Sequence, residues 1–257
     1  MSSPLAAPTD LPVFLDRLRA AGQLVEVETP VDADLEASEV HRRVIAAGGP
    51  ALLFTNPVGY DVPVATNLFG TPSRVERCFG RRPKDFVQRA VALTHELVPP
   101  TLGKLWAQRD FFMEGLRVGM KPVARGPVTE VVEQPAKLNA IPMIKSWPKD
   151  GGDFVTLPLV YTEHPEDGSH NLGMYRVQRH SDTTTGMHWQ IGKGGGFHHH
   201  LAQKLGQDLP TTVFVGGPPA LTLAAVAPLP ENVPELLLAS LLAGERLQRA
   251  ANPAGPH

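Results

Sequence analysis

The fold and the chemistry of this chain centre on Asn171-Leu172-Gly173-Met174-Tyr175-Arg176-Val177-Gln178 and on Met187-His188-Trp189-Gln190-Ile191, which follows it. Both runs have the composition of short strands. The polar loop between them, 181–186, ends in glycine, which favours a hairpin. Two strands that carry polar side chains and lie side by side predict the wall of a pocket.

Length, charge and composition limit the classes of protein to which this chain can belong. With 257 residues the chain is long enough for one large domain or two modest ones. Its 24 basic and 26 acidic residues give a net charge of −2, so no overall charge favours nucleic acid or an anionic membrane. No apolar run approaches the ~20 residues that span a bilayer, and the N-terminus has no signal-peptide pattern. A single cysteine, Cys78, fits a reducing compartment. These features predict a cytoplasmic protein with no nucleic-acid or membrane partner.

The first part of the chain alternates helices and strands. Leu11, Phe14, Leu15 and Leu18 follow a helical period behind Asp10, a potential N-cap, and Gly22 can end that helix. The pattern predicts helices at 11–21, after Asp34 to about 47, at 72–79, 84–98 and 104–117, and strands at 24–27, 50–54 and 62–66. This part is expected to be a small α/β domain over 1–120.

After Pro122 the sequence pattern changes to short strand-like runs separated by glycine and proline. We expect strands at 127–133, 155–162, 171–179, 186–191, 211–216 and 219–226, helices near 197–206 and 232–245, and a frayed end from Ala250. Many short strands at this spacing predict a barrel or sandwich over 121–257. The fold class is therefore α+β.

Arg176 is the first candidate for chemistry. Strand alternation places it on one face with Met174 and Gln178. A phosphate or carboxylate ligand would satisfy the donors of its guanidinium best. A salt bridge at a sheet edge is an equally common role for such an arginine. The glycine run 192–196, with Lys193, can turn backbone N–H groups toward an anion at a helix start, although a plain flexible turn is the commoner role of such a run.

The histidines give weaker signals. Adjacent residues on a helix point in different directions, so His198, His199 and His200 cannot all bind one ion. His188, inside an apolar strand, is more often a core histidine than a ligand. Carboxylates for a hard cation are available at Glu231 and Glu235, where the helix dipole alone also favours acidic residues.

An ordered series of motifs resembles the UbiD family of reversible decarboxylases, which use prenylated FMN. The series covers nearly the whole chain: Pro30-Val31-Asp32, Gly48 to Phe54, Asn67 to Val75, Ile141-Pro142, Trp147-Pro148, Asn171 to Gln178, Met187 to Gln190 and Pro228 to Glu235. The resemblance implies an N-terminal α/β domain followed by a split β-barrel of the flavin-reductase type, incomplete over these residues.

The resemblance also implies site residues. Asn171, His188 and Glu235 match the positions that hold a divalent metal, usually manganese, against the cofactor phosphate, and potassium is a further candidate ion. Oxygen and imidazole ligands suit manganese. The residues that match cofactor-binding positions are Met174, Tyr175, Arg176, His188, Trp189, Gln190, Lys193 and Gly194.

The implied reaction is the loss of carbon dioxide from an aromatic or α,β-unsaturated carboxylic acid, with the flavin as electron sink. Arg176 matches the arginine of a glutamate–arginine–glutamate network. Family members continue beyond the length of this chain with the segment that carries the acidic groups and with a domain that closes the site. These 257 residues are therefore expected to be the cofactor-binding half, in a longer protein, in a homo-oligomer or beside a second chain.

Two other classes of function stay open. A non-catalytic flavin- or phosphate-binding accessory subunit would need no acidic residues of its own. A metal hydrolase built on His198 to His200 is disfavoured by the spacing of those residues. The substrate and the proton donor are not encoded in a readable pattern.

Overall fold

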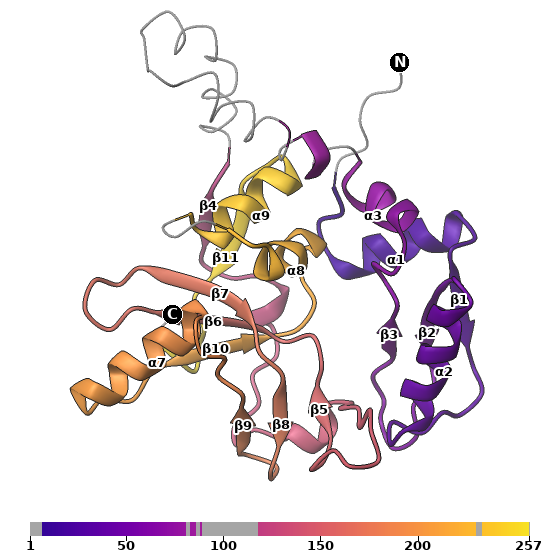
Figure 1. Cartoon of the computed structure of the whole chain (residues 1–257), viewed down its shortest axis with the longest axis horizontal. Coiled ribbons are helices and arrows are strands. Elements are labelled where there is room, and N and C mark those ends of the chain that lie inside the picture. Colours follow the sequence, from indigo (N-terminus) through magenta and orange to yellow (C-terminus); the bar gives the residue numbers. More distant parts are fainter. Residues whose placement is uncertain (1–6, 81–82, 86–87, 89–117, 230–232, 257) are drawn as a thin grey trace, which may run out of the picture.

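The computed structural model describes residues 7–80, 83–85, 88, 118–229 and 233–256, which form an N-terminal region and a β-rich region (Figure 1). In Figure 1 the N-terminal region, in indigo and purple, lies beside the orange strands of the β-rich region. The larger of two apolar core clusters joins the two regions, since Phe14 and Leu18 belong to the same cluster as Leu159, Leu172 and Ala239.

The N-terminal region is a three-stranded sheet with helices, ordered β1-β2-β3. Strands β1 and β2 are parallel, and β2 and β3 are antiparallel. The elements are α1 (Leu11–Ala20), β1 (Leu24–Val27), α2 (Glu36–Ala46), β2 (Ala51–Phe54), β3 (Val64–Thr66) and α3 (Pro72–Phe79). The elements expected at 11–21, 24–27, 50–54, 62–66 and 72–79 are confirmed.

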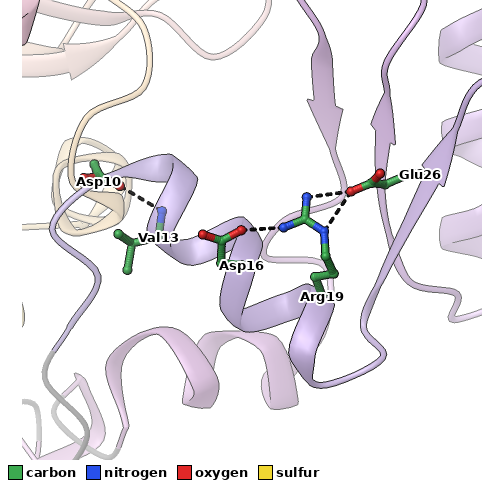
Figure 2. A network of polar contacts seen from close by, with 5 residues as sticks. All are labelled: Asp10, Val13, Asp16, Arg19 and Glu26. Atoms are coloured by element: carbon green, nitrogen blue, oxygen red, sulfur yellow. Dashed lines mark hydrogen bonds and ion pairs between the residues drawn. The ribbon is translucent and has the colours of Figure 1, made fainter.

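The start of α1 follows the expected capping chemistry, as Figure 2 shows. The Asp10 carboxylate accepts a hydrogen bond from the Val13 N–H at 2.8 Å, which satisfies one of the unpaired amides of the first turn. Arg19 in the last turn donates to Glu26 of β1 at 2.8 Å. This contact ties the helix to the strand that follows it.

The cap expected at Asp34 is wrong. Helix α2 begins after Leu35, which has a positive φ of 69° and forms no side-chain cap. Asp34 instead donates its N–H to Asp32, and the Glu36 carboxylate accepts from the Asp32 N–H at 2.8 Å. The acidic residues therefore form a compact turn, and the Asp32 carbonyl oxygen accepts the Ala37 N–H of the first helical turn at 2.9 Å.

The β-rich region consists of three small sheets, ordered β10-β6-β7, β5-β8-β9 and β11-β4, and no closed barrel is found over the described residues. Its elements are β4 (Met120–Val123), η1 (Pro127–Thr129), η2 (Leu138–Ala140), β5 (Phe154–Val155), β6 (Leu159–Glu163), β7 (His170–Met174), β8 (Val177–Arg179), β9 (Thr185–Met187), α7 (Gly194–Leu205), β10 (Thr211–Phe214), α8 (Pro219–Val226), α9 (Glu235–Ala243) and β11 (Leu247–Ala250).

Two of the expected strands are each broken into two. The run 155–162 divides at Pro158 into the end of β5 and the start of β6, and the run 171–179 divides at residues 175–176 into β7 and β8. In both cases the two pieces belong to different sheets. The hairpin expected around 181–186 is present, because β8 and β9 pair antiparallel.

Two other strand predictions are wrong. Over 127–133 the chain forms only the short helix η1, and Val128 and Val131 are exposed. Over 219–226 it forms helix α8. That run is rich in alanine and leucine and starts with a proline, which suits the first turn of a helix. It is apolar on all sides because it packs against α9 in the core.

The remaining expectations concern the segment 84–117 and the C-terminal end of the sequence. The helices expected at 84–98 and 104–117 lie outside the described residues, apart from a few positions. The end expected to fray from Ala250 instead includes that residue in β11, which pairs in parallel with β4. Among the helices that the structure describes, none is long and apolar enough to cross a membrane.

Candidate functional site

Strand β7 carries Asn171 on one face and His170, Leu172 and Met174 on the other. Alternation places Asn171, Gly173 and the following Tyr175 on the first face. Leu172 and Met174, on the second face, belong to or pack against the main core. Asn171 is 9% exposed, and no partner of its amide nitrogen is found among the described residues. A buried amide group of this kind marks a place where a ligand or water is expected.

Tyr175 folds back along this face and is 4% exposed. Gly173 makes room for it, since a Cβ at that position would stand 2.4 Å from Cε2 of the tyrosine ring. The phenol oxygen accepts a hydrogen bond from the Gly195 N–H at 3.0 Å. Burial raises the pKa of Tyr175, while the neighbouring Gly195 amide and the Asn171 side chain act in the opposite direction. The tyrosine thus joins β7 to the start of α7.

The glycine run is a close-packed helix start. A Cβ at Gly194 would lie 2.1 Å from the Asn171 side-chain oxygen, and one at Gly195 would lie 2.7 Å from the Trp189 ring. A Cβ at Gly196 would lie 2.4 Å from the Gln190 carbonyl oxygen. Helix α7 begins at Gly194, three residues earlier than expected, and a side chain at any of these three glycines would meet a different neighbour.

Trp189 links the loop after β9 to α7. Its ring lies 5.1 Å from the Tyr175 ring and stacks on His199 at 5.4 Å. The strand expected at 186–191 ends at Met187, so His188 is a loop residue and not a core histidine. Gln190 and Lys193 are exposed in the same loop.

Glu235 approaches β7 from the start of α9. Its carboxylate accepts a hydrogen bond from the Leu172 N–H at 3.2 Å, on the strand edge that no other strand of that sheet covers among the described residues. The helix dipole also favours an acidic side chain at this end of a helix. Glu235 therefore bonds to the residue next to Asn171. Asn171, Tyr175, Gly194, Gly195 and Glu235 are called the Asn171 cluster below.

Arg176 lies apart from the Asn171 cluster in every contact that the structure describes. Its side chain is exposed, lies over the Phe154 ring at 3.9 Å and forms an ion pair with Asp150 at 3.4 Å. Of the two roles left open for Arg176, the structure has the salt bridge. The Arg176 guanidinium is accessible to a ligand anion from solvent, whereas the Asp150 side chain is only 11% exposed.

The break at 175–176 also removes a conflict. If β7 and β8 were one regular strand, Asn171 and Arg176 would lie on opposite faces, so Asn171 would need a loop or a bulge. In the structure Asn171 lies inside regular β7, paired with Thr162, and the chain changes sheet before Arg176. The irregular step therefore lies at Tyr175, not at Asn171.

The three consecutive histidines have three different surroundings. His198 is buried and shares a hydrogen bond of 3.0 Å with Thr162, His199 stacks on Trp189, and His200 is exposed. Over the part of the chain that the structure describes, no group of three or more His, Cys, Asp or Glu side chains is arranged to hold a metal. The expected metal ligands include only two such residues, since Asn171 would bind through its amide oxygen.

Sequence reasoning missed the contribution of Gly173 and of the Tyr175 hydroxyl. Both belong to the motif that attracted attention, but the contact joins residues 20 positions apart. No local pattern predicts which backbone amide a buried phenol reaches.

Two family models match the chain. The 3-octaprenyl-4-hydroxybenzoate carboxy-lyase Rift-related domain (UbiD) matches residues 121–254, which is about half of the sequence. The N-terminal domain of the same carboxy-lyase (UbiD_N) matches residues 15–94.

Curated relatives extend this similarity. A protein of Chlamydia pneumoniae, named as one subunit of a 4-hydroxybenzoate decarboxylase, is 46% identical over 239 residues, which is 93% of this chain and 41% of the relative. An uncharacterised protein of Chlamydia caviae is 44% identical over 98% of this chain and 43% of its own length. The chain thus spans less than half the length of these relatives.

Solved structures share the fold at lower identity. The closed form of vanillic acid decarboxylase from Sedimentibacter hydroxybenzoicus (ShVdcCD) matches with a TM-score of 0.77 and 20% identity, over 97% of this chain and 52% of that one. The UbiD-class enzyme HmfF from Pelotomaculum thermopropionicum, in an evolved dimeric form in complex with prFMN, matches with a TM-score of 0.73 and 21% identity, over 96% and 53%. The family match over half of the sequence, with the shared fold over nearly all of it, means that this chain belongs to the UbiD family.

Proposed function

We propose that this chain is the cofactor-binding half of a UbiD-type enzyme that removes carbon dioxide reversibly from an aromatic or α,β-unsaturated carboxylic acid. Prenylated FMN would be the cofactor and manganese the divalent metal. The structure of HmfF in complex with prFMN supports the flavin, because that chain has the same fold. The partners needed for activity are the remaining length that relatives possess or a second chain.

The Asn171 cluster is the observation that carries this proposal. Glu235 accepts the N–H of Leu172, the neighbour of Asn171 on β7, and the helix start at Gly194 lies against the Asn171 side chain. An amide oxygen and a carboxylate are suitable ligands for manganese, and the start of α7 with Lys193 favours a phosphate. The buried, unsatisfied Asn171 nitrogen could then donate to a phosphate oxygen. The residues of this cluster therefore fit a phosphate held through a metal.

Each residue has a proposed role. Asn171, His188 and Glu235 would hold the metal, and Lys193 with Gly194 would face the phosphate. When bound, prenylated FMN supplies the electron sink for the carbon–carbon bond that breaks. Arg176 would exchange Asp150 for the cofactor or the substrate carboxylate, which it can orient with two parallel hydrogen bonds.

The test is to express the chain with a supply of prenylated FMN and to measure retained cofactor by absorbance and mass spectrometry, with metal analysis of the same sample. We expect a flavin phosphate and manganese in comparable amounts. Folded protein that retains neither would contradict the proposal.

Glu235→Gln tests the metal site directly. We expect manganese binding to weaken by about 10- to 100-fold or more, with the fold intact. Loss of a residue that only supports a ligand already costs about that much at metal sites. Glu36→Gln is the matched control, because Glu36 also opens a helix and accepts one backbone N–H. Equal manganese retention in both variants would remove Glu235 from the site. His188→Gln, with His200→Gln as control, tests the third ligand in the same way.

A second candidate function is a flavin-binding accessory subunit without activity of its own. It is supported by the name of the Chlamydia pneumoniae relative, which describes one subunit of a decarboxylase and not the whole enzyme. The two candidates differ in turnover once the remaining length that relatives possess is restored: the cofactor-binding half, loaded with prenylated FMN, should then convert aromatic or cinnamate-like acids, whereas the accessory subunit should leave them unchanged. Release of carbon dioxide by the isolated loaded chain would exclude this second candidate.

A further inference from the structure

We propose that Tyr175 is a positioning residue whose phenol oxygen caps α7, so that the glycine helix start is held against Asn171. This inference rests on the proposed function, since the cap matters for the ligand that this helix start would bind. It assigns the tyrosine side chain to the protein interior and not to contact with the cofactor.

The start of α7 lacks the usual cap. Lys193 occupies the N-cap position and forms no side-chain cap within the described residues, although serine, threonine, aspartate and asparagine are the preferred residues there. The first amides of a helix have no partner inside the helix and need one elsewhere. The Gly195 N–H finds it in the Tyr175 hydroxyl, inside the protein. A residue from another strand therefore replaces the missing cap.

The glycine run is consequently only partly open to an anion. Gly195 is buried with its N–H directed at Tyr175, whereas Gly194 is exposed. An anion at this helix start would meet Gly194 and Lys193 and could not take the Gly195 amide. The tyrosine thereby fixes the position of the helix and leaves the Gly194 amide and Lys193 for the ligand.

The space left by the missing side chain of Gly173 and the contact with the Trp189 ring together position Tyr175. That space lets the tyrosine ring lie along β7 toward Asn171, and the tryptophan lies 5.1 Å away on the α7 side. A Cβ at Gly195 would itself meet the phenol oxygen at 3.0 Å. The helix start, the tyrosine and Asn171 are therefore packed as one unit, and moving any of them shifts the presentation of the Asn171 amide.

The first experiment measures the cap without any ligand. In the wild-type chain we expect the Gly195 amide hydrogen to exchange with solvent more slowly than that of Gly194, by about 10-fold or more if the bond has its usual strength. Tyr175→Phe keeps the ring and removes the hydroxyl, so Gly195 exchange should accelerate toward the Gly194 rate. Equal exchange of the two amides in the wild type would overturn the proposal without any variant.

Tyr161→Phe is the matched control. Tyr161 lies on β6 and pairs with Leu172, on the face of the sheet opposite to Asn171. Its hydroxyl group donates a hydrogen bond to Glu163 at 2.7 Å. Tyr161→Phe also loses a hydroxyl group that has a hydrogen-bond partner. Comparing the two variants therefore separates the effect on Gly195 from a general loss of stability. Faster Gly195 exchange in Tyr161→Phe as well would mean that the effect is general loosening, which would contradict a cap.

The second experiment titrates FMN in the presence of manganese. We expect Tyr175→Phe to bind FMN about 3- to 10-fold more weakly, the effect of one hydrogen bond, and Tyr161→Phe to bind like the wild type. Unchanged or tighter binding by Tyr175→Phe would overturn the inference, since it would show that Tyr175 does not hold the site. If the wild type binds neither FMN nor manganese, the proposed function fails, and the exchange experiment still decides the cap.

Discussion

Two buried polar clusters among the described residues are built from similar parts, and they differ in how the helix start beside them is closed. Asn67, Gly70 and Arg74, called the Arg74 cluster, lie in the N-terminal region, and the Asn171 cluster lies in the β-rich region. In each, an asparagine oxygen lies where a glycine Cβ would be, 1.8 Å from that position at Gly70 and 2.1 Å at Gly194. Each also lies at the start of a helix.

The difference lies in how the helix start is closed. At α3 the Thr71 side chain caps its own helix by accepting the Arg74 N–H. Arg74 donates to the Gly49 carbonyl at 3.0 Å and Asn67 to the Pro50 carbonyl at 2.7 Å, while Arg74 Nε, Arg74 Nη2 and Asn67 Oδ1 have no partner among the described residues. At α7 the cap comes from Tyr175, and Gly194 stays exposed. A buried asparagine beside a glycine thus indicates close packing, and a helix start without a cap of its own is the added feature that favours a ligand.

Arg74→Ala should have the largest effect on stability and none on ligand binding. Arg74 is 1% exposed and is among the largest fully buried side chains, so truncation leaves a cavity. We expect the free energy of unfolding to fall by about 3–5 kcal/mol, measured by urea denaturation. Arg74→Met, which preserves most of the volume, should cost less. Flavin binding that weakens in the folded Met variant would break the distinction between the clusters.

Gly70→Ala and Gly194→Ala form a matched pair. Each adds a methyl group against an asparagine oxygen, and we expect each to lower the free energy of unfolding by about 1–3 kcal/mol through overpacking. Only Gly194→Ala should also weaken retention of FMN and manganese, measured by titration. Loss of retention in both variants would show that binding merely follows stability.

His198→Gln tests a smaller effect that is confined to the β-rich region. Burial lowers the pKa of His198, the neighbouring His164 lowers it further, and Asp167 opposes them. Because the unfolded chain then binds more protons, the free energy of unfolding should fall as the pH drops below about 6.5.

The measurement is thermal unfolding between pH 5 and 8. The Gln variant should show a flatter dependence on pH than the wild type, whereas His200→Gln, at an exposed position, should keep the wild-type slope. Equal slopes in all three proteins would remove His198 as the source.

Cys78 gives the smallest expected effect and probes the N-terminal region. Its burial in the core raises the pKa of the thiol to about 12, with Arg17 acting in the opposite direction. At pH 8 the native thiol should react with iodoacetamide roughly 100-fold more slowly than the unfolded one, followed by mass spectrometry. Rapid labelling of the native protein would mean that this core opens easily.

Much of the N-terminal region could be predicted from the sequence because its signals are local. The helical period from Leu11 to Leu18, with Asp10 before it and Gly22 after it, predicted α1, and Thr71-Pro72 marks the start of α3 in the same way. In the β-rich region local signals failed where burial decided the outcome. The run 219–226 is apolar throughout, so its sequence does not distinguish a buried strand from a buried helix.

The sequence by itself determined the family, the hairpin around 181–186 and the residues that carry polar chemistry. Those properties depend on residue identity and short spacings. Only the tertiary structure decided that the chain changes sheet at 175–176, that Arg176 pairs with Asp150, and that Tyr175 reaches Gly195. These are contacts between segments far apart in the chain, and they depend on which backbone amides and free spaces remain once the strands have paired.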